Sequence, residues 1–289
     1  MKEFVEKWQE LLKERLDEIT NQFTYSNVLR ESIRYTVLNW GKLFRPTLTM
    51  VVLHDLVDDP SVGLDAACAI EMLHNYGLIH DDLPSMDDDR YRRGKLCNHL
   101  VYGEAQAILA GDALQAEAFK LFATLEVEDS VKVDLLAYIA ELMGANGLVG
   151  GQSLDIISAN EEREDVDLEQ LNKIHFAKTG GLIEAAIITG GLIGKVSKET
   201  LEKLRELSYH VGLAFQIRDD INDLVLTNEQ LGKDTKSDLK NDKLTYPKIY
   251  GLEKSQAILA EHTDRALSII IDVFGKDSYT YQFIKEGLK

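Results

Sequence analysis

Two aspartates stand four residues apart in the segment DDIND, at Asp219 and Asp223, directly after a run of mostly apolar residues. In a helix, side chains at this spacing project from the same face, so the two carboxylates would lie close together. Two like charges about 4 Å apart repel each other by on the order of 4 kcal/mol at an effective dielectric constant near 20. A divalent cation would offset this repulsion, and oxygen ligands favour magnesium, manganese or calcium over zinc. The segment therefore predicts a metal site.

A second acidic segment, DDLPSMDDD, follows another apolar run at residues 81–89. Asp81 and Asp87 are six residues apart, which a regular helix would place about 240° apart around its axis. They converge only if the helix is distorted, and Pro84 gives a reason because it removes a backbone donor within this turn. A single acidic run is more often a solvated loop. Two such runs, each ending an apolar helix, favour magnesium ions whose remaining positions are filled by phosphate oxygens.

Basic residues accompany these clusters although the chain as a whole is acidic, with a net charge of −17. Guanidinium groups bind phosphate oxygens in bidentate fashion, so arginines beside a metal site suit a diphosphate ligand. Taken singly, each basic residue is better explained by a surface salt bridge, and the prediction depends on the whole set. The set comprises Lys42, Arg45, Arg92, Arg93, Lys178, Lys233 and Lys243. His74 lies two helical turns before Asp81 on the same face, where a histidine is more often an ordinary core residue.

Helices must position these residues, because apolar residues recur at three- and four-residue steps almost throughout the chain. Alternating strand patterns bounded by turn pairs are missing. Helices are expected at about residues 27–40, 45–57, 62–80, 103–125, 130–149, 166–192, 197–226 and 246–273. With 45% hydrophobic residues and only four prolines, the chain is expected to form a single domain over residues 1–289. The predicted fold class is all-α, a single large helical bundle whose acidic clusters line one rim of a deep pocket.

Composition also argues against several classes of protein. A net charge of −17 does not suit nucleic acid, which needs a basic face. Two cysteines, Cys68 and Cys97, are too few for a disulfide framework and indicate a reducing compartment. The first residues form an amphipathic pattern rather than a signal peptide, and no apolar run is free enough of charge and glycine to predict a membrane span. The expected location is the cytoplasm.

Five segments of the chain together resemble one enzyme family. In chain order they are GKLFRP, LIHDDLPSMDDDRYRRG, FAKTGGL, FQIRDDINDL and GKD followed by KLTYP. They are similar to the motifs of the trans-isoprenyl diphosphate synthases, most of all the bacterial farnesyl diphosphate synthases, over about residues 35–250. The resemblance implies an all-α isoprenoid synthase fold around a central cavity, assembled as a homodimer.

The resemblance also implies roles for residues at matching positions. Three magnesium ions would bind an allylic diphosphate, with Asp81, Asp87 and Asp219 as metal ligands and Asp82, Asp220 and Asp223 as supporting carboxylates. The residues that would hold the allylic diphosphate are Arg92, Lys178, Thr179, Gln216 and Lys233. The residues that would hold isopentenyl diphosphate are Gly41, Lys42, Arg45, His74 and Arg93.

The implied reaction is prenyl transfer. Magnesium would assist ionisation of dimethylallyl or geranyl diphosphate, and the carbocation would alkylate isopentenyl diphosphate to give farnesyl diphosphate. Tyr76 lies five residues before Asp81, about 1.4 helical turns, and would limit the product to fifteen carbons. Gly77 beside it would widen the pocket, so a twenty-carbon geranylgeranyl diphosphate synthase is the alternative. Tyr76 could also be ordinary core packing.

Two other kinds of protein that resemble this family are alternatives to a prenyl diphosphate synthase. A terpene cyclase shares the first aspartate motif, but its second motif differs from DDIND, and it has no use for Lys42, Arg45 and Arg93. A non-catalytic regulatory subunit of a prenyl synthase would lack one aspartate motif, and both are intact here.

Overall fold

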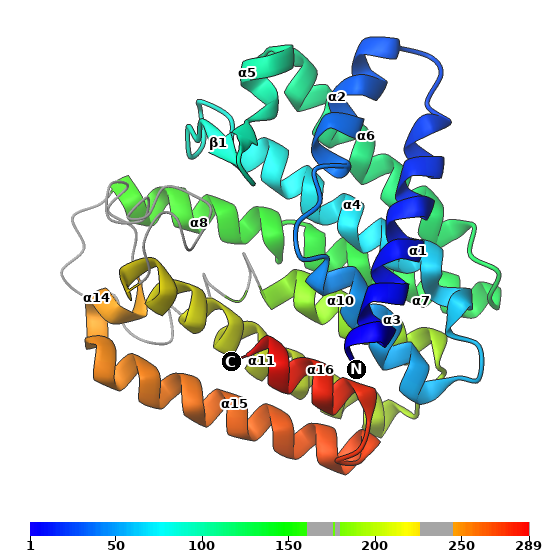
Figure 1. The fold of residues 1–289 in the computed structure, drawn as a ribbon, viewed down its shortest axis with the longest axis vertical. Helices are drawn as coiled ribbons and strands as arrows, with labels where there is room; N and C mark the ends of the chain where they lie inside the picture. The colour runs from blue at the N-terminus through cyan, green and yellow to red at the C-terminus, as the bar shows by residue number, and fades with distance from the viewer. Residues whose placement is uncertain (161–175, 177–179, 226–244, 289) are drawn as a thin grey trace. The chain divides into compact units, whose positions relative to one another are not determined.

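The computed structural model describes residues 1–160, 176, 180–225 and 245–288. These residues are mostly helical (Figure 1), which confirms the predicted all-α class. Strands within the described residues are limited to one short antiparallel pair, β1 (Tyr91–Arg92) and β2 (Lys95–Leu96), in which Tyr91 pairs with Leu96.

The chain divides into two compact units, Met1–Leu136 and Ala137–Lys289. The first unit contains α1 (Lys2–Asn21), α2 (Asn27–Val37), α3 (Phe44–Leu56), the 3-10 turn η1 (Pro60–Gly63), α4 (Leu64–Asp81), β1, β2, α5 (Asn98–Tyr102) and α6 (Glu104–Ala123). Helix α7 (Asp129–Met143) is divided between the two units, and the second unit continues with α8 (Leu148–Asn160), α10 (Gly181–Ile193), α11 (Lys198–Val225), α14 (Tyr246–Tyr250), α15 (Leu252–Phe274) and α16 (Tyr279–Gly287). The expectation of a single domain stays a prediction.

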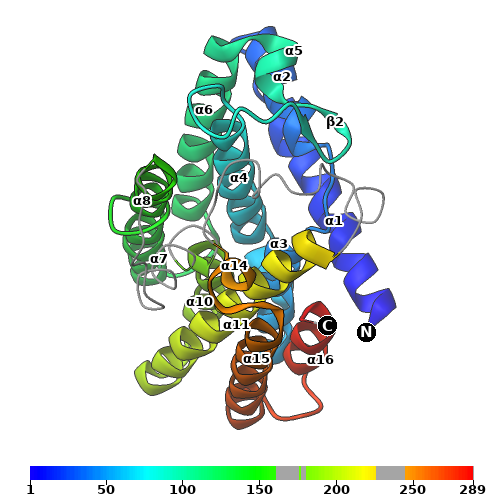
Figure 2. The same cartoon turned by 90° about the vertical axis from the view of Figure 1, so that its left-hand side faces the viewer.

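Helix α4 is the centre of the first unit. It packs against α1, α2, α3 and α6 (Figure 2) and is buried along most of its length. Its residues Cys68, Ile70, Met72 and Leu73 are fully buried, as expected of a helix that is apolar on all sides. The rigid core therefore fixes the helix whose last residue is Asp81.

Helix α11 has the corresponding role in the second unit, where it packs against α10, α14 and α15. Leu213, Ile217 and Ile221 on α11 form a buried cluster with Tyr246 of α14. Where α11 passes the start of α10, a side chain at Gly212 would place its Cβ 2.8 Å from the Cα of Gly180, so this crossing requires glycine. The cluster holds the last turns of α11 in place.

Two of the predicted helices are interrupted. The pattern at 246–273 predicts one helix, but the chain breaks at Gly251, which has φ of +77° and separates α14 from α15. The pattern at 130–149 likewise continues past the end of α7 at Met143. Both predictions of a continuous helix were wrong at glycines. The apolar period of the sequence continues through a turn, and only the local backbone geometry shows where the helix ends.

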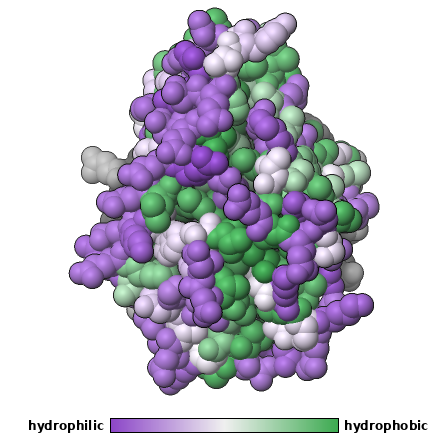
Figure 3. All heavy atoms as spheres, turned by 90° about the vertical axis from the view of Figure 1, so that its right-hand side faces the viewer, coloured by the Kyte–Doolittle hydropathy of each residue, from purple (hydrophilic) through white to green (hydrophobic). Residues whose placement is uncertain are grey.

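Hydrophobic side chains are exposed in patches among hydrophilic ones on the face drawn in Figure 3. By length and apolar composition alone, Asp129–Ile157 could cross a membrane. Buried core helices of soluble proteins meet the same criterion, so this is weak evidence, and the expected lack of a membrane span stays a prediction.

A pair of histidines joins α11 to α15 and makes stability depend on pH. The Nδ1 atoms of His210 and His262 lie 2.8 Å apart, and burial lowers the pKa of both rings. Below the ordinary histidine pKa near 6.5 the unfolded chain therefore binds more protons than the folded one, so stability falls as the pH drops through that value. When the pH is lowered from about 7 to about 5, we expect the Tm of His262→Gln to fall by less than the Tm of the wild type. An equal loss, measured by circular dichroism beside His54→Gln as the control, would contradict this.

Candidate active site

The first aspartate motif begins where α4 ends. The backbone N–H of Asp87 donates to the carbonyl of Asp81 over 2.9 Å, and a turn closes between Leu83 and Asp88, whose φ is +51°. A proline disfavours helical geometry in the residue before it, which explains why the helix stops just ahead of Pro84. The predicted distortion within a helix is thus a helix end followed by a turn. The outcome is the same, since the backbones of Asp81 and Asp87 are adjacent.

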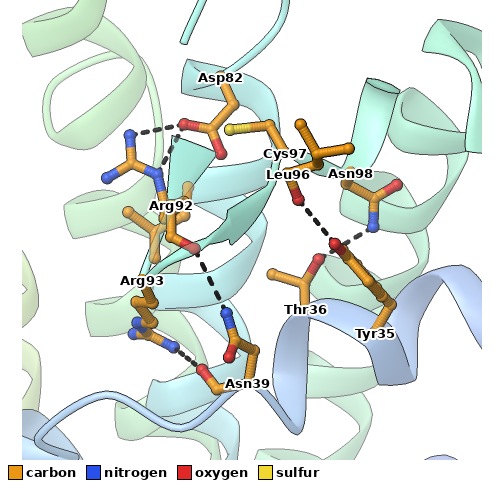
Figure 4. A pocket seen from close by; sticks show the side chains of 10 residues that line it. Tyr35, Thr36, Asn39, Asp82, Arg92, Arg93, Leu96, Cys97 and Asn98 are labelled. Carbon is orange, nitrogen blue, oxygen red and sulfur yellow. Dashed lines mark hydrogen bonds and ion pairs between the residues drawn. The ribbon is translucent and has the colours of Figure 1, made fainter. Parts of the chain in front are cut away.

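Arg92 holds this turn to the β1–β2 hairpin. Its Nε donates to Asp82 Oδ1 over 2.7 Å (Figure 4). Its Nη2 donates to Asp89 Oδ2 over 3.0 Å. Burial lowers the pKa of the Arg92 guanidinium, but the two carboxylates outweigh it and the net shift is upward. Asp82 is only 3% exposed, so it acts as the buried anchor of this network. That geometry fits its predicted supporting role, and the fixed guanidinium stands directly beside the acidic turn.

Arg93 lies at the centre of a second group. Its Nη1 donates to the carbonyl of Asn39 over 2.8 Å, and its Nη2 lies 3.5 Å from His74 Nε2 (Figure 4 shows Arg93 and Asn39). A Cβ added at Gly41 would fall 2.8 Å from Arg93 Nε, so this glycine makes room for the guanidinium. Glu71 Oε1 is 3.7 Å from Nη2. Three residues predicted to hold isopentenyl diphosphate, Gly41, His74 and Arg93, are therefore brought together.

The charge state of His74 follows from these neighbours. Burial lowers the pKa of its ring well below the ordinary value, and the positive charges of Arg45, Arg93 and Arg92 lower it further. His74 is therefore neutral near pH 7 and its Nε2 can accept from Arg93. The histidine therefore contacts Arg93 and is not an isolated core residue.

Lys42 and Arg45 flank the start of α3. Leu43 caps this helix in the left-handed region, with φ of +46°, and Arg45 is the second helical residue. Lys42 is exposed. The first backbone N–H groups of a helix have no partner within it and favour anions, so two cations at this end add to an environment suited to phosphate.

A cavity of about 20 Å³ lies between the hairpin and the helices α2 and α4 (Figure 4). Its lining includes Tyr35, Asn39, Asp82, Arg93 and Cys97. This volume suits about one water molecule. The cavity is therefore too small for a prenyl diphosphate.

The second aspartate motif lies in the last turns of α11. Asp220 is 4% exposed and accepts from Gln216 Nε2 over 2.7 Å and from the backbone N–H of Tyr246 over 3.1 Å. It therefore joins α11 to α14, which fits a supporting carboxylate. Asp219 pairs with Arg218 over 3.0 Å, and its side chain is 45% exposed. Asp219 and Asp223 are one turn apart on the same helix, as predicted.

The amide of Gln216 donates to Asp220. Its expected role in holding the allylic diphosphate stays a prediction. Lys178, Thr179 and Lys233 lie outside the described residues. In the part of the chain that the structure describes, no three His, Cys, Asp or Glu side chains gather closely enough to hold a metal ion. The magnesium ligands therefore stay predictions, although an all-carboxylate donor set suits that ion.

Tyr76 faces α6 from the buried side of α4. Its ring meets His80 edge to face at 5.0 Å between centroids, and its hydroxyl bonds to Gln115. The ring is 9% exposed. Gly77, the next residue on α4, is half-buried. Packing and the predicted chain-length role are both compatible with this position.

The sequence prediction missed Glu71, Asn75 and Asn39. Glu71 is a single carboxylate within the apolar run AIEMLHNYG, one turn before His74. A lone charge in a helix that is otherwise buried needs a partner, so this signal was present in the sequence.

Several known proteins are similar to this chain. Residues 26–270 match the family model described as polyprenyl synthetase. Geranylgeranyl pyrophosphate synthase 7 of Arabidopsis thaliana is 46% identical over 83% of this chain and 68% of that protein. The farnesyl diphosphate synthase of Bacillus subtilis is 41% identical over 90% of this chain and 88% of that protein. A solved geranyltransferase from Helicobacter pylori, complexed with magnesium and isoprenyl diphosphate, is 30% identical with a TM-score of 0.82, over 99% of this chain and 95% of that one. The resemblance predicted from the motifs is confirmed.

Proposed function

This chain belongs to the polyprenyl synthetase family, and we propose that it condenses isopentenyl diphosphate with dimethylallyl and then geranyl diphosphate to give farnesyl diphosphate. One observation carries the proposal: in the first unit, the acidic turn after α4 lies beside arginines whose side chains are held by hydrogen bonds. Asp81 and Asp87 are adjacent at the end of α4, and Arg92 binds the neighbouring Asp82. Carboxylates for a metal and guanidiniums for phosphate thus stand side by side.

Within this proposal Asp81, Asp87 and Asp219 hold magnesium, three ions in each active site. Bound magnesium supplies Lewis-acid stabilisation of the departing diphosphate. The chain's own residues bind and orient the substrates. Arg92 and Arg93 are held by ion pairs and backbone acceptors, so little side-chain entropy is lost on binding. Neutral His74 adds a ring nitrogen without a further positive charge.

The product is proposed to have fifteen carbons. Synthases of both fifteen- and twenty-carbon products are among the similar proteins, so similarity alone does not decide between them. Tyr76 favours the shorter product, because an aromatic ring five residues before Asp81 occupies space along α4 that a longer tail would need. Incubation of the purified protein with dimethylallyl and isopentenyl diphosphates, followed by sizing of the products, tests both the activity and the length. A main product of twenty carbons would contradict the assignment.

The two basic groups are proposed to bind different substrates. Replacement of Lys42 or Arg45 by alanine should raise the KM for isopentenyl diphosphate by about 10- to 100-fold, since a hydrogen bond to a charged group contributes about 1.5–3 kcal/mol. The KM for the allylic diphosphate should change little. Lys178→Ala should have the reverse effect. Steady-state kinetics with each substrate varied in turn measure both constants, and equal losses for both substrates in every variant would contradict the division.

A homodimer in the cytoplasm is part of the proposal. Leu100, Val101, Ile108 and Leu109 on α5 and α6 are 42–49% exposed, and apolar side chains gathered on adjacent helices suit an interface. Sedimentation should then give twice the chain mass of 32.5 kDa. A species of 32.5 kDa at micromolar concentration would contradict it.

A further inference from the structure

Glu71 is a buried carboxylate that the proposed reaction does not use. It lies on α4 and is 2% exposed. Its Oε1 accepts from Asn75 Nδ2 over 3.1 Å, and Asn75 Nδ2 also donates to the Glu71 carbonyl over 2.8 Å. A buried carboxylate is costly unless it is paired, so its partners explain its presence.

The partner across from Glu71 is the Arg93 guanidinium, at 3.7 Å from Nη2 to Oε1. Burial lowers the pKa of Arg93, and Glu71 is the strongest of the charges that oppose this shift. Arg45 and Arg93 in turn oppose the rise that burial causes in the pKa of Glu71. The carboxylate therefore stabilises a group of cations that would otherwise repel one another in a poorly solvated place.

Arg93 also needs this support for geometric reasons. Its backbone has φ of +52°, a region that costs a residue other than glycine about 1 kcal/mol. Its guanidinium donates to the Asn39 carbonyl, and a Cβ added at Gly41 would fall 2.8 Å from its Nε, so the guanidinium fills the space beside that glycine. Glu71 and His74 are one turn apart on the same face of α4, and both approach Nη2. These contacts approach the guanidinium from several sides.

We propose that Glu71 is a positioning residue, which holds Arg93 in place to bind the diphosphate of isopentenyl diphosphate. It does not touch the substrate. It acts through the arginine, whose orientation and charge it maintains before the ligand arrives. The inference rests on the proposed function.

The experiment compares Glu71→Gln with Glu184→Gln. Glu184 is also buried, at 8% exposure, and bonds to Tyr138 in the second unit, so its replacement is a matched loss of a buried carboxylate. We expect Glu71→Gln to raise the KM for isopentenyl diphosphate by about 10-fold or more, with the KM for the allylic diphosphate within about 2-fold of wild type. Glu184→Gln should leave both constants unchanged.

A double-mutant cycle separates positioning from a general effect on structure. If Glu71 acts through Arg93, then adding Glu71→Gln to Arg93→Ala should change the KM for isopentenyl diphosphate by less than about 2-fold. Glu71→Asp keeps the charge and should show a smaller rise with the same substrate selectivity, which provides a readout if the glutamine variant does not fold by circular dichroism.

The inference would be overturned if Glu71→Gln left the KM for isopentenyl diphosphate unchanged or lower, or if it raised the KM for both substrates equally. It would also be overturned if Glu71→Gln raised the KM for isopentenyl diphosphate in the Arg93→Ala background as much as it does in the wild type. A wild-type protein that turns over neither substrate pair would instead contradict the proposed function, so the two failures are distinguishable.

Discussion

Replacing Asp81 with asparagine should lower turnover by about 10³-fold while the protein stays folded. Asp81 is the last residue of α4, and its carbonyl accepts the N–H of Asp87, so the backbone geometry does not depend on its side chain. The carboxylate would be lost as a ligand of the ion that stabilises the departing diphosphate. Removal of one such stabilising group typically costs about 10²- to 10³-fold in turnover. Steady-state rates at saturating magnesium and saturating substrates measure the effect, and Asp219→Asn should behave alike.

Asp58→Asn is the matched control, because Asp58 is an exposed aspartate in the loop before η1 and has no part in the proposed site. It should keep the wild-type rate. Chelation of the divalent ion should abolish activity in the wild type, and magnesium should restore it. A near-normal rate for Asp81→Asn at saturating magnesium would show that the metal assignment is wrong.

The helical fold could be predicted because the apolar period is strong where the helices are buried. The pattern at 62–80 corresponds to α4, Leu64–Asp81, and the pattern at 197–226 to α11, Lys198–Val225. These helices position the two acidic motifs, so the architecture around the motifs followed from the sequence. The interruption at Gly251 did not, since it depends on one residue's positive φ rather than on a pattern.

The types of the site residues could also be predicted from the sequence. Which of them are buried in contacts and which are exposed could not be predicted. Asp220 and Asp219 are neighbours in sequence with the same side chain, yet one is buried in contacts with Gln216 and Tyr246 and the other is 45% exposed. Which carboxylate faces inward depends on the rotation of α11 about its axis, which packing against α14 and α15 decides. Spacing alone gives the face that residues share, not the direction of that face.

Contacts between distant segments were the least predictable feature. Arg93 meets Asn39, 54 residues away, through a side chain-to-backbone bond. A backbone carbonyl leaves no signature in the sequence, because every residue has one. Glu71 was more accessible to prediction, since a single acid in a buried apolar helix requires a partner, but the partner's identity depends on where the β1–β2 hairpin folds back.

The second large effect is expected at Tyr76, whose replacement by alanine should lengthen the main product from fifteen to twenty carbons or more. The ring lies on α4 about 1.4 turns before Asp81, where it packs on His80 and bonds to Gln115 of α6. Truncation to alanine removes the aromatic volume from the path of a tail that extends along the helix from the diphosphate. Chromatographic sizing of the dephosphorylated products measures the change.

Tyr76→Phe is the control that separates ring volume from hydrogen bonding, because it removes only the hydroxyl that reaches Gln115 and keeps the edge-to-face contact with His80. Its main product should still have fifteen carbons. If Tyr76 is only core packing, alanine leaves a cavity between α4 and α6, lowers the Tm and keeps a fifteen-carbon product. If the ring ends the tail's path, the product lengthens in the alanine variant alone, since a carbon chain can occupy the space that the ring leaves.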